Sequence, residues 1–108
     1  MSANDPREEE QSGLATASKP KVERPKRYKV LMHNDDYTTM EFVVHVLQKY
    51  FNKTRPEAQS IMLEVHTRGF AACGIYTYEV AESKVAKIGK YALDNGHPLK
   101  CTMEPEDD

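Results

Sequence analysis

Two helix-start signals in the middle of the chain constrain its fold more than any other feature. Thr38 and Thr54 are each followed three residues later by a glutamate, which is the spacing of a capping box at a helix N-terminus. Apolar residues recur at helical spacing after the first signal, so we predict a helix over residues 39–51 with Thr38 as its N-cap. A second helix begins after Thr54 and ends at Gly69, because glycine readily adopts the left-handed conformation that ends helices.

Three segments around these helices have the character of strands. Residues 28–33 and 99–103 alternate apolar and polar side chains, whereas residues 70–76 form a short apolar run typical of a buried strand. Thr77 can cap a third helix, and a later Asn-Gly pair ends it. The resulting order β-α-α-β-α-β predicts an α/β (α+β) sandwich, in which three helices cover one face of a three-stranded sheet.

The opposite face of this sheet is expected to be partly exposed to solvent. Lys29, Leu31 and His33 alternate with the inward-facing residues of the first strand, and they fit a half-polar outer face. The sheet should therefore bury its other face only.

The two ends of the chain differ in composition from the part between them. Residues 1–25 are rich in Glu, Ser, Lys and Pro, and their only large aliphatic residues are Leu14 and Val22. Such a segment cannot bury enough apolar surface to offset its loss of conformational entropy. We predict a disordered N-terminal extension over residues 1–25, which is either a solvated tail or a flexible handle for a partner. A core domain follows over residues 26–108, with an acidic, frayed end from residue 104.

Composition narrows the class of protein. A net charge of -2 excludes a basic surface over the whole chain of the kind that binds nucleic acid. No apolar run approaches the roughly 20 residues that cross a membrane, and the acidic start resembles neither a secretory signal nor a transit peptide. We expect a cytoplasmic, monomeric protein with no nucleic-acid or membrane partner. In that compartment, Cys73 and Cys101 should be buried thiols rather than a disulfide.

The chain lacks the motifs of the common catalytic and cofactor sites. None of its five glycines has the spacing of a phosphate-binding loop, and there is no GxSxG, HExxH or CxxC motif. We therefore expect no enzymatic activity and no cofactor. His33, Asp35, Asp36 and His66 are possible metal-ligand types, but their spacing matches no closed site, so we predict no metal site.

The Asn34-Asp35-Asp36 turn is the most unusual polar feature of the chain. Asn and Asp favour turns, and three consecutive acceptor side chains suit a cationic or NH-rich partner. An N-terminal ammonium group would match them, because it carries one charge and three donors. The local features are equally those of a solvated turn without a ligand. His45 and His97 are interpreted as surface or capping residues.

Several motifs in one order resemble the ClpS adaptors of bacteria. The resemblance covers about residues 26–104 at uninterrupted spacing. The segments that carry it are 34–43 (NDDYTTMEFV), 62–66 (MLEVH), 73–82 (CGIYTYEVAE) and 97–102 (HPLKCT). The fold of the family agrees with the order of elements predicted above.

The resemblance implies an adaptor for N-degrons, which are proteins whose free first residue is Leu, Phe, Tyr or Trp. Such an adaptor delivers them to the AAA+ unfoldase ClpA, which works with the peptidase ClpP. Glu79 and Lys84 match the surface that docks on the ClpA N-terminal domain. The N-terminal extension matches the segment that the unfoldase engages during delivery.

The resemblance also implies the residues of the degron site. Asn34, Asp36 and His66 match the positions that hold the α-amino group, and Asp35 contributes nearby. The apolar pocket for the first side chain matches Thr38, Met40, Val43, Met62, Val65 and Leu99. Thr39 stands where many members have proline, which we expect to loosen the turn before the first helix.

Overall fold

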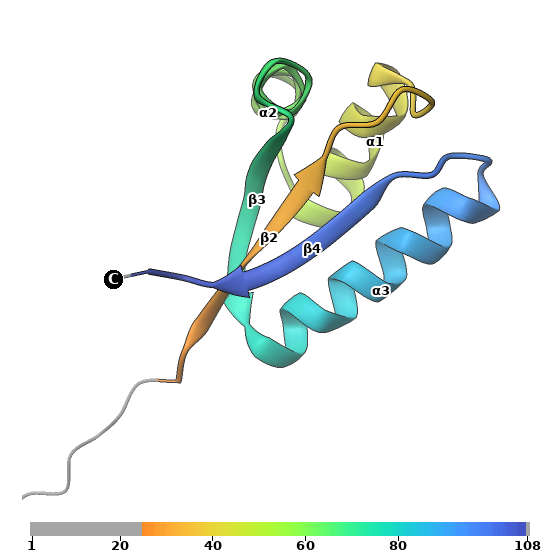
Figure 1. Cartoon of the computed structure of the whole chain (residues 1–108). Helices are drawn as coiled ribbons and strands as arrows, with labels where there is room; N and C mark the ends of the chain where they lie inside the picture. The colour runs from red at the N-terminus through yellow and green to blue at the C-terminus, as the bar shows by residue number, and fades with distance from the viewer. Residues whose placement is uncertain (1–24, 108) are drawn as a thin grey trace, which may run out of the picture.

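The computed structural model describes residues 25–107 and shows three helices and a three-stranded sheet (Figure 1). The elements are β2 (Arg27–His33), α1 (Met40–Phe51), α2 (Arg55–Arg68), β3 (Phe70–Thr77), α3 (Tyr78–Asp94) and β4 (Lys100–Pro105). This order confirms the predicted β-α-α-β-α-β arrangement. The predicted extension over residues 1–25 lies outside the described residues, apart from Pro25.

Strand β2, the first strand within residues 25–107, is the centre of the sheet. The strand order is β3-β2-β4, and both neighbours run antiparallel to β2, as Figure 1 shows. Met32, for example, lies opposite Ala71 of β3 and Cys101 of β4. Because β2 is paired on both sides, its last residues are held firmly where the chain leaves the sheet.

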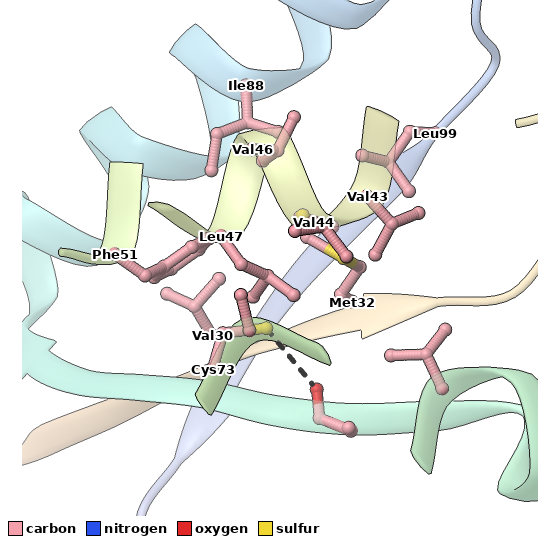
Figure 2. Packing of buried hydrophobic residues seen from close by; sticks show 14 of the residues in the cluster. Val30, Met32, Val43, Val44, Val46, Leu47, Phe51, Cys73, Ile88 and Leu99 are labelled. Atoms are coloured by element: carbon pink, nitrogen blue, oxygen red, sulfur yellow. Dashed lines mark hydrogen bonds between the residues drawn. The ribbon is translucent and has the colours of Figure 1, made fainter. Parts of the chain in front are cut away.

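The core lies between one face of this sheet and the helices. Val30, Met32 and Cys73 on the sheet face Val46 and Leu47 of α1, and Figure 2 shows these side chains packed together with Ile88 of α3. Most of the apolar residues that recur along α1 are therefore buried, but Met40 at its start is 47% exposed.

The segment predicted to be a buried strand, β3, is instead an edge strand with alternating burial. Ala71 and Cys73 point into the core, whereas Phe70 and Ile75 are 41% and 43% exposed. An extra residue in β3 shifts the register, since Val30 pairs with Gly74 but Leu31 pairs with Ala72. This bulge keeps Ile75 on the outer face of the sheet.

The first helix begins one residue later than predicted. Its N-cap is Thr39, whose hydroxyl oxygen accepts from the Phe42 amide at 3.1 Å. Thr38 was predicted as the cap, but its hydroxyl donates to Asp35 instead. The capping box predicted between Thr38 and Glu41 is therefore wrong. Thr39, where we expected a looser turn, is the residue that caps the helix.

The other helix boundaries agree with the prediction. Thr54 and Glu57 form the capping box of α2, with the Thr54 amide donating to Glu57 at 2.9 Å. Gly69 ends that helix with a φ of 94°, a left-handed conformation that glycine adopts without strain. Thr77 caps α3, as expected.

Two expectations about the sheet surface and the chain end need correction. Leu31, expected on the partly exposed face, is only 8% exposed, and it lies between its pairing partners Ala72 of β3 and Thr102 of β4. The predicted frayed end is ordered at Glu106, because the Glu106 amide donates to the Arg27 carbonyl at 2.8 Å. The Glu106 carboxylate also pairs with the Arg27 guanidinium at 2.9 Å.

The cysteines behave as predicted. Cys73 and Cys101 are buried free thiols, and burial raises the pKa of each to about 12.

Among residues 25–107, no helix is both long and apolar enough to span a bilayer.

Candidate functional site

A cavity of about 240 Å³ opens where the β2–α1 loop meets the start of α1 and the second half of α2. Its lining residues are Asn34, Asp35, Asp36, Thr38, Met40, Val43, Met62, Val65 and His66. The cavity thus brings together all four predicted amine-binding residues and five of the six predicted pocket residues. Leu99 is the exception.

The loop side of the cavity is ordered by a single carboxylate. Asp35 Oδ1 accepts from the amides of Tyr37 at 2.8 Å and Thr38 at 2.7 Å. Its Oδ2 accepts from the Thr38 hydroxyl at 2.7 Å. Both carboxylate oxygens therefore accept hydrogen bonds within the loop, and Asp35 orders this side of the cavity.

The surroundings of Asp35 favour its ionised form. Burial raises the pKa of the carboxyl group. The hydrogen bonds from the Thr38 hydroxyl and the Tyr37 and Thr38 amides lower this pKa by more, and the nearby His97 adds a smaller lowering. The net pKa lies below the ordinary value. The turn is therefore held together by a charge that persists at neutral pH.

The remaining polar groups of the cavity keep their hydrogen-bonding capacity. Within residues 25–107, the side chains of Asn34, Asp36 and His66 make no hydrogen bond to another protein group, and all three residues are exposed. An amide oxygen, a carboxylate and an imidazole are thus available around one opening. This set can accept several hydrogen bonds from one cationic donor.

A backbone contact brings the two halves of the polar set together. The Asn34 amide donates to the Gly69 carbonyl at 2.9 Å, which joins the β2–α1 loop to the end of α2. His66 lies in the last turn of that helix. Residues far apart in sequence therefore meet at the cavity because Gly69 turns the chain back toward β2.

The apolar wall of the cavity is also part of the core. Val43 and Val65 are 7% and 2% exposed, and both belong to the buried cluster. Met62 packs against that cluster, while Met40 is 47% exposed at the opening. The cavity is therefore a gap at the edge of the core, with a rigid valine floor and a flexible methionine at its mouth.

Leu99 occupies a different place from the one predicted. It is 5% exposed and belongs to the core cluster with Val43, as Figure 2 shows, but it does not line the cavity. It lines a separate hollow together with Val85 and Leu93.

The predicted docking residues lie at a separate hollow of about 330 Å³. Glu79 and Lys84 line it together with Tyr50, Val80, Ser83 and Lys87. The Lys84 ammonium donates to the Tyr50 carbonyl at 2.6 Å and lies 5.1 Å from the centre of the Tyr76 ring. The sequence did not point to Val80, which lines the same hollow and is 45% exposed.

No metal centre is evident in the described part of the chain. Residues 25–107 contain no group of three or more His, Cys, Asp or Glu side chains placed to hold a metal ion. His33, which was weighed as a ligand, contacts the Thr102 hydroxyl at 2.8 Å on the sheet instead.

Similar proteins extend these observations. Residues 23–102 match the family described as "ATP-dependent Clp protease adaptor protein ClpS". The chain is 56% identical to the ATP-dependent Clp protease adapter protein ClpS of Rhodospirillum centenum over 95 residues, which is 88% of each chain. It is 63% identical to the corresponding protein of Gluconobacter oxydans over 83 residues, covering 77% of this chain and 70% of the relative.

A solved structure shares the fold. The structure of Agrobacterium tumefaciens ClpS2 bound to L-phenylalaninamide superposes with a TM-score of 0.74 at 37% sequence identity. The match covers 77% of this chain and 100% of that chain.

The sandwich and its relatives define a small protease-adaptor domain. The chain belongs to the ClpS family, the adaptor proteins of the ATP-dependent Clp protease. The predicted family and fold are thereby confirmed.

Proposed function

We propose that this adaptor binds proteins with a free N-terminal Leu, Phe, Tyr or Trp and delivers them to the ClpA unfoldase of the ClpAP protease. The observation that carries the proposal is the joining of two unlike surfaces in one cavity. Free acceptors on Asn34, Asp36 and His66 stand beside an apolar wall formed by Val43 and Val65. An N-terminal residue is the one part of a protein that offers an ammonium group and a large side chain on the same carbon atom.

The size of the cavity supports a ligand of one residue. A volume of about 240 Å³ is below the range of roughly 300–1,000 Å³ that is typical of sites for drug-sized molecules. The similar Agrobacterium protein was solved with L-phenylalaninamide, a single amino acid with a free amine and an aromatic side chain. This chain keeps the chemical features that such a ligand requires.

Both parts of the ligand are needed for useful affinity. Burying a Leu or Phe side chain contributes roughly 1.5–3 kcal/mol. Each hydrogen bond to a charged amine contributes roughly 1.5–3 kcal/mol. Two or three such bonds and the side chain together give on the order of 5–12 kcal/mol before association costs, whereas micromolar affinity needs about 8 kcal/mol. Neither part is sufficient by itself.

The second hollow supports the delivery step. It is built around the start of α3, and it shares no lining residue with the degron cavity. Glu79 and Lys84 could therefore contact the ClpA N-terminal domain while a degron is bound. In this scheme the protein acts as a monomeric cytoplasmic adaptor without a catalytic role, a cofactor, a metal, or a nucleic-acid or membrane partner.

Peptides that differ only in their first residue test the proposal. We expect fluorescence anisotropy to show micromolar or tighter binding for Leu, Phe, Tyr and Trp peptides and much weaker binding for Ser or Glu peptides. An acetylated Leu peptide removes the charge and two donors but keeps the side chain, so its binding should be lost. Equal binding of the free and acetylated peptides would refute amine recognition.

A further inference from the structure

His97 makes an unusual set of contacts for a residue outside the cavity. It lies between α3 and β4, and its backbone amide donates to the Ala92 carbonyl at 2.8 Å. Its ring stacks on Phe42, with centroids 4.1 Å apart and planes inclined by 23°. The C-terminal end of α3 thus holds a flat ring against the start of α1.

Phe42 belongs to the helical turn that builds the cavity. Its amide donates to the Thr39 cap, and the neighbouring positions 40 and 43 line the cavity. Residues two apart on a helix point in nearly opposite directions, so Phe42 and Met40 leave α1 on different sides. The His97–Phe42 stack therefore supports this turn from the side away from Met40.

His97 also reaches the loop that precedes the turn. It is near enough to contribute to the lowered pKa of the Asp35 carboxyl group, and Asp35 in turn holds Tyr37 and Thr38 in place. The Nδ1 atom of His97 is buried and has no hydrogen-bond partner within residues 25–107. A residue that served only as a solvated surface group would not bury a ring nitrogen in this way.

From these contacts we infer that His97 is a positioning residue for the first-residue pocket. Its ring holds the first turn of α1 and the adjoining loop in the arrangement that gives the cavity its width. Removal of the ring would let Met40 and the loop move apart, so the pocket would distinguish less sharply between side chains of different shape. This inference rests on the proposed function, since it concerns the selectivity of the same pocket.

His45 provides a matched control on the same helix. Its ring lies 6.0 Å from that of Phe42, and its Nε2 contacts the Tyr91 hydroxyl at 2.6 Å. It therefore joins α1 to α3, whereas His97 joins the segment between α3 and β4 to α1, and His45 lies three residues beyond Phe42 along the helix. If histidine–aromatic contacts only stabilised the fold, replacing His97 or His45 by alanine would affect peptide selectivity alike.

The test compares selectivity rather than affinity. We would measure the dissociation constants of Leu- and Ile-initial peptides for the full chain, His97→Ala, His97→Phe and His45→Ala. For His97→Ala we expect the dissociation constant of the Ile-initial peptide, divided by that of the Leu-initial peptide, to fall by roughly two- to tenfold. This range corresponds to the energy of one aromatic pair. His97→Phe keeps a flat ring and should keep the ratio, as should His45→Ala.

The outcomes separate the two proposals. An unchanged ratio in folded His97→Ala would overturn the role of His97, and so would an equal loss of selectivity in His45→Ala. Failure of the unaltered chain to bind either peptide would instead overturn the proposed function. If thermal melting shows His97→Ala to be unfolded, His97→Leu fills the space without a flat ring, and the same fall in the ratio is expected for it.

Discussion

The two adjacent aspartates of the cavity should respond differently to the same substitution. Asp35 accepts three hydrogen bonds at 2.7–2.8 Å within the loop, whereas Asp36 accepts none from the described residues. Asp35→Ala therefore removes the acceptors that order the loop, and Asp36→Ala removes only an acceptor available to a ligand. Sequence alone presents them as equivalent members of one acidic turn.

The expected magnitudes follow from these contacts. Loss of the Asp35 interactions should destabilise the fold by about 2 kcal/mol, because the residue is only partly buried and water replaces some of the bonds. For a domain of this size, that corresponds to a fall in Tm of roughly 8–16 °C. Asp36→Ala should leave Tm nearly unchanged and weaken binding by roughly 10- to 150-fold, the value of one hydrogen bond to a charged group.

Thermal melting followed by circular dichroism and anisotropy titration with a Leu-initial peptide would measure both quantities. Asp35→Ala should lower both Tm and affinity, while Asp35→Asn should lie between it and the unaltered chain because the amide keeps one acceptor oxygen. The division of roles would be refuted if Asp36→Ala melted as low as Asp35→Ala. It would equally be refuted if Asp35→Ala bound and melted like the unaltered chain.

Three further predictions concern the mouth of the cavity and its pH dependence. Met40→Ala should admit Ile- or Val-initial peptides, because the exposed methionine at the opening restricts branched side chains; unchanged selectivity in the anisotropy assay would remove that role. His66→Ala should weaken binding of a Leu-initial peptide by roughly 10-fold or more, because it removes an acceptor that faces the cavity. Unchanged affinity in the anisotropy assay would argue against contact between His66 and the ammonium. The fold lowers the pKa of Asp35 below its ordinary value of 3.8. The ionised carboxylate therefore stabilises the fold above that pH, and this stabilisation is lost as the pH falls through the lower folded pKa. The Tm difference between the unaltered chain and Asp35→Asn should shrink below about pH 4.

The order of elements was predictable because each has a strong local signal. The capping box at Thr54 and the glycine at position 69 bracket α2, and both act through bonds within a few residues. The start of α1 was misplaced because two adjacent threonines compete for the cap. Asp35 binds the first of them, and that bond is invisible to a search based on spacing alone.

The edge position of β3 was not predictable for a different reason. An apolar run of seven residues is compatible with burial on one face or on both. The bulge that inserts an extra residue opposite Val30 and Leu31 decides which side chains face outward, and it has no sequence signal of its own. The exposure of Phe70 and Ile75 thus depends on pairing with β2.

The site was predictable as a set of residues but not as a division of roles. The resemblance to the ClpS family named the residues, and the cavity brings together nine of the ten residues assigned to the degron site. The resemblance could not show that Asp35 accepts hydrogen bonds within the loop, that Leu99 packs in the core without lining the cavity, or that His97 contacts Phe42. Each of these depends on contacts between segments that only the folded chain brings together.

The sharing of residues between the core and the cavity limits how the specificity of this adaptor can change. Val43 and Val65 belong to both, so a smaller residue at either position would enlarge the pocket and also leave a void in the core. Met40 lines the cavity but is largely free of the core, and its substitution changes the opening without that penalty. Variation in the accepted first residue should therefore be easiest at position 40, while the valine floor keeps the requirement for an apolar side chain. The free acceptors on Asn34, Asp36 and His66 likewise lie outside the core cluster, so the proposed recognition of an amine should be alterable without unfolding the domain.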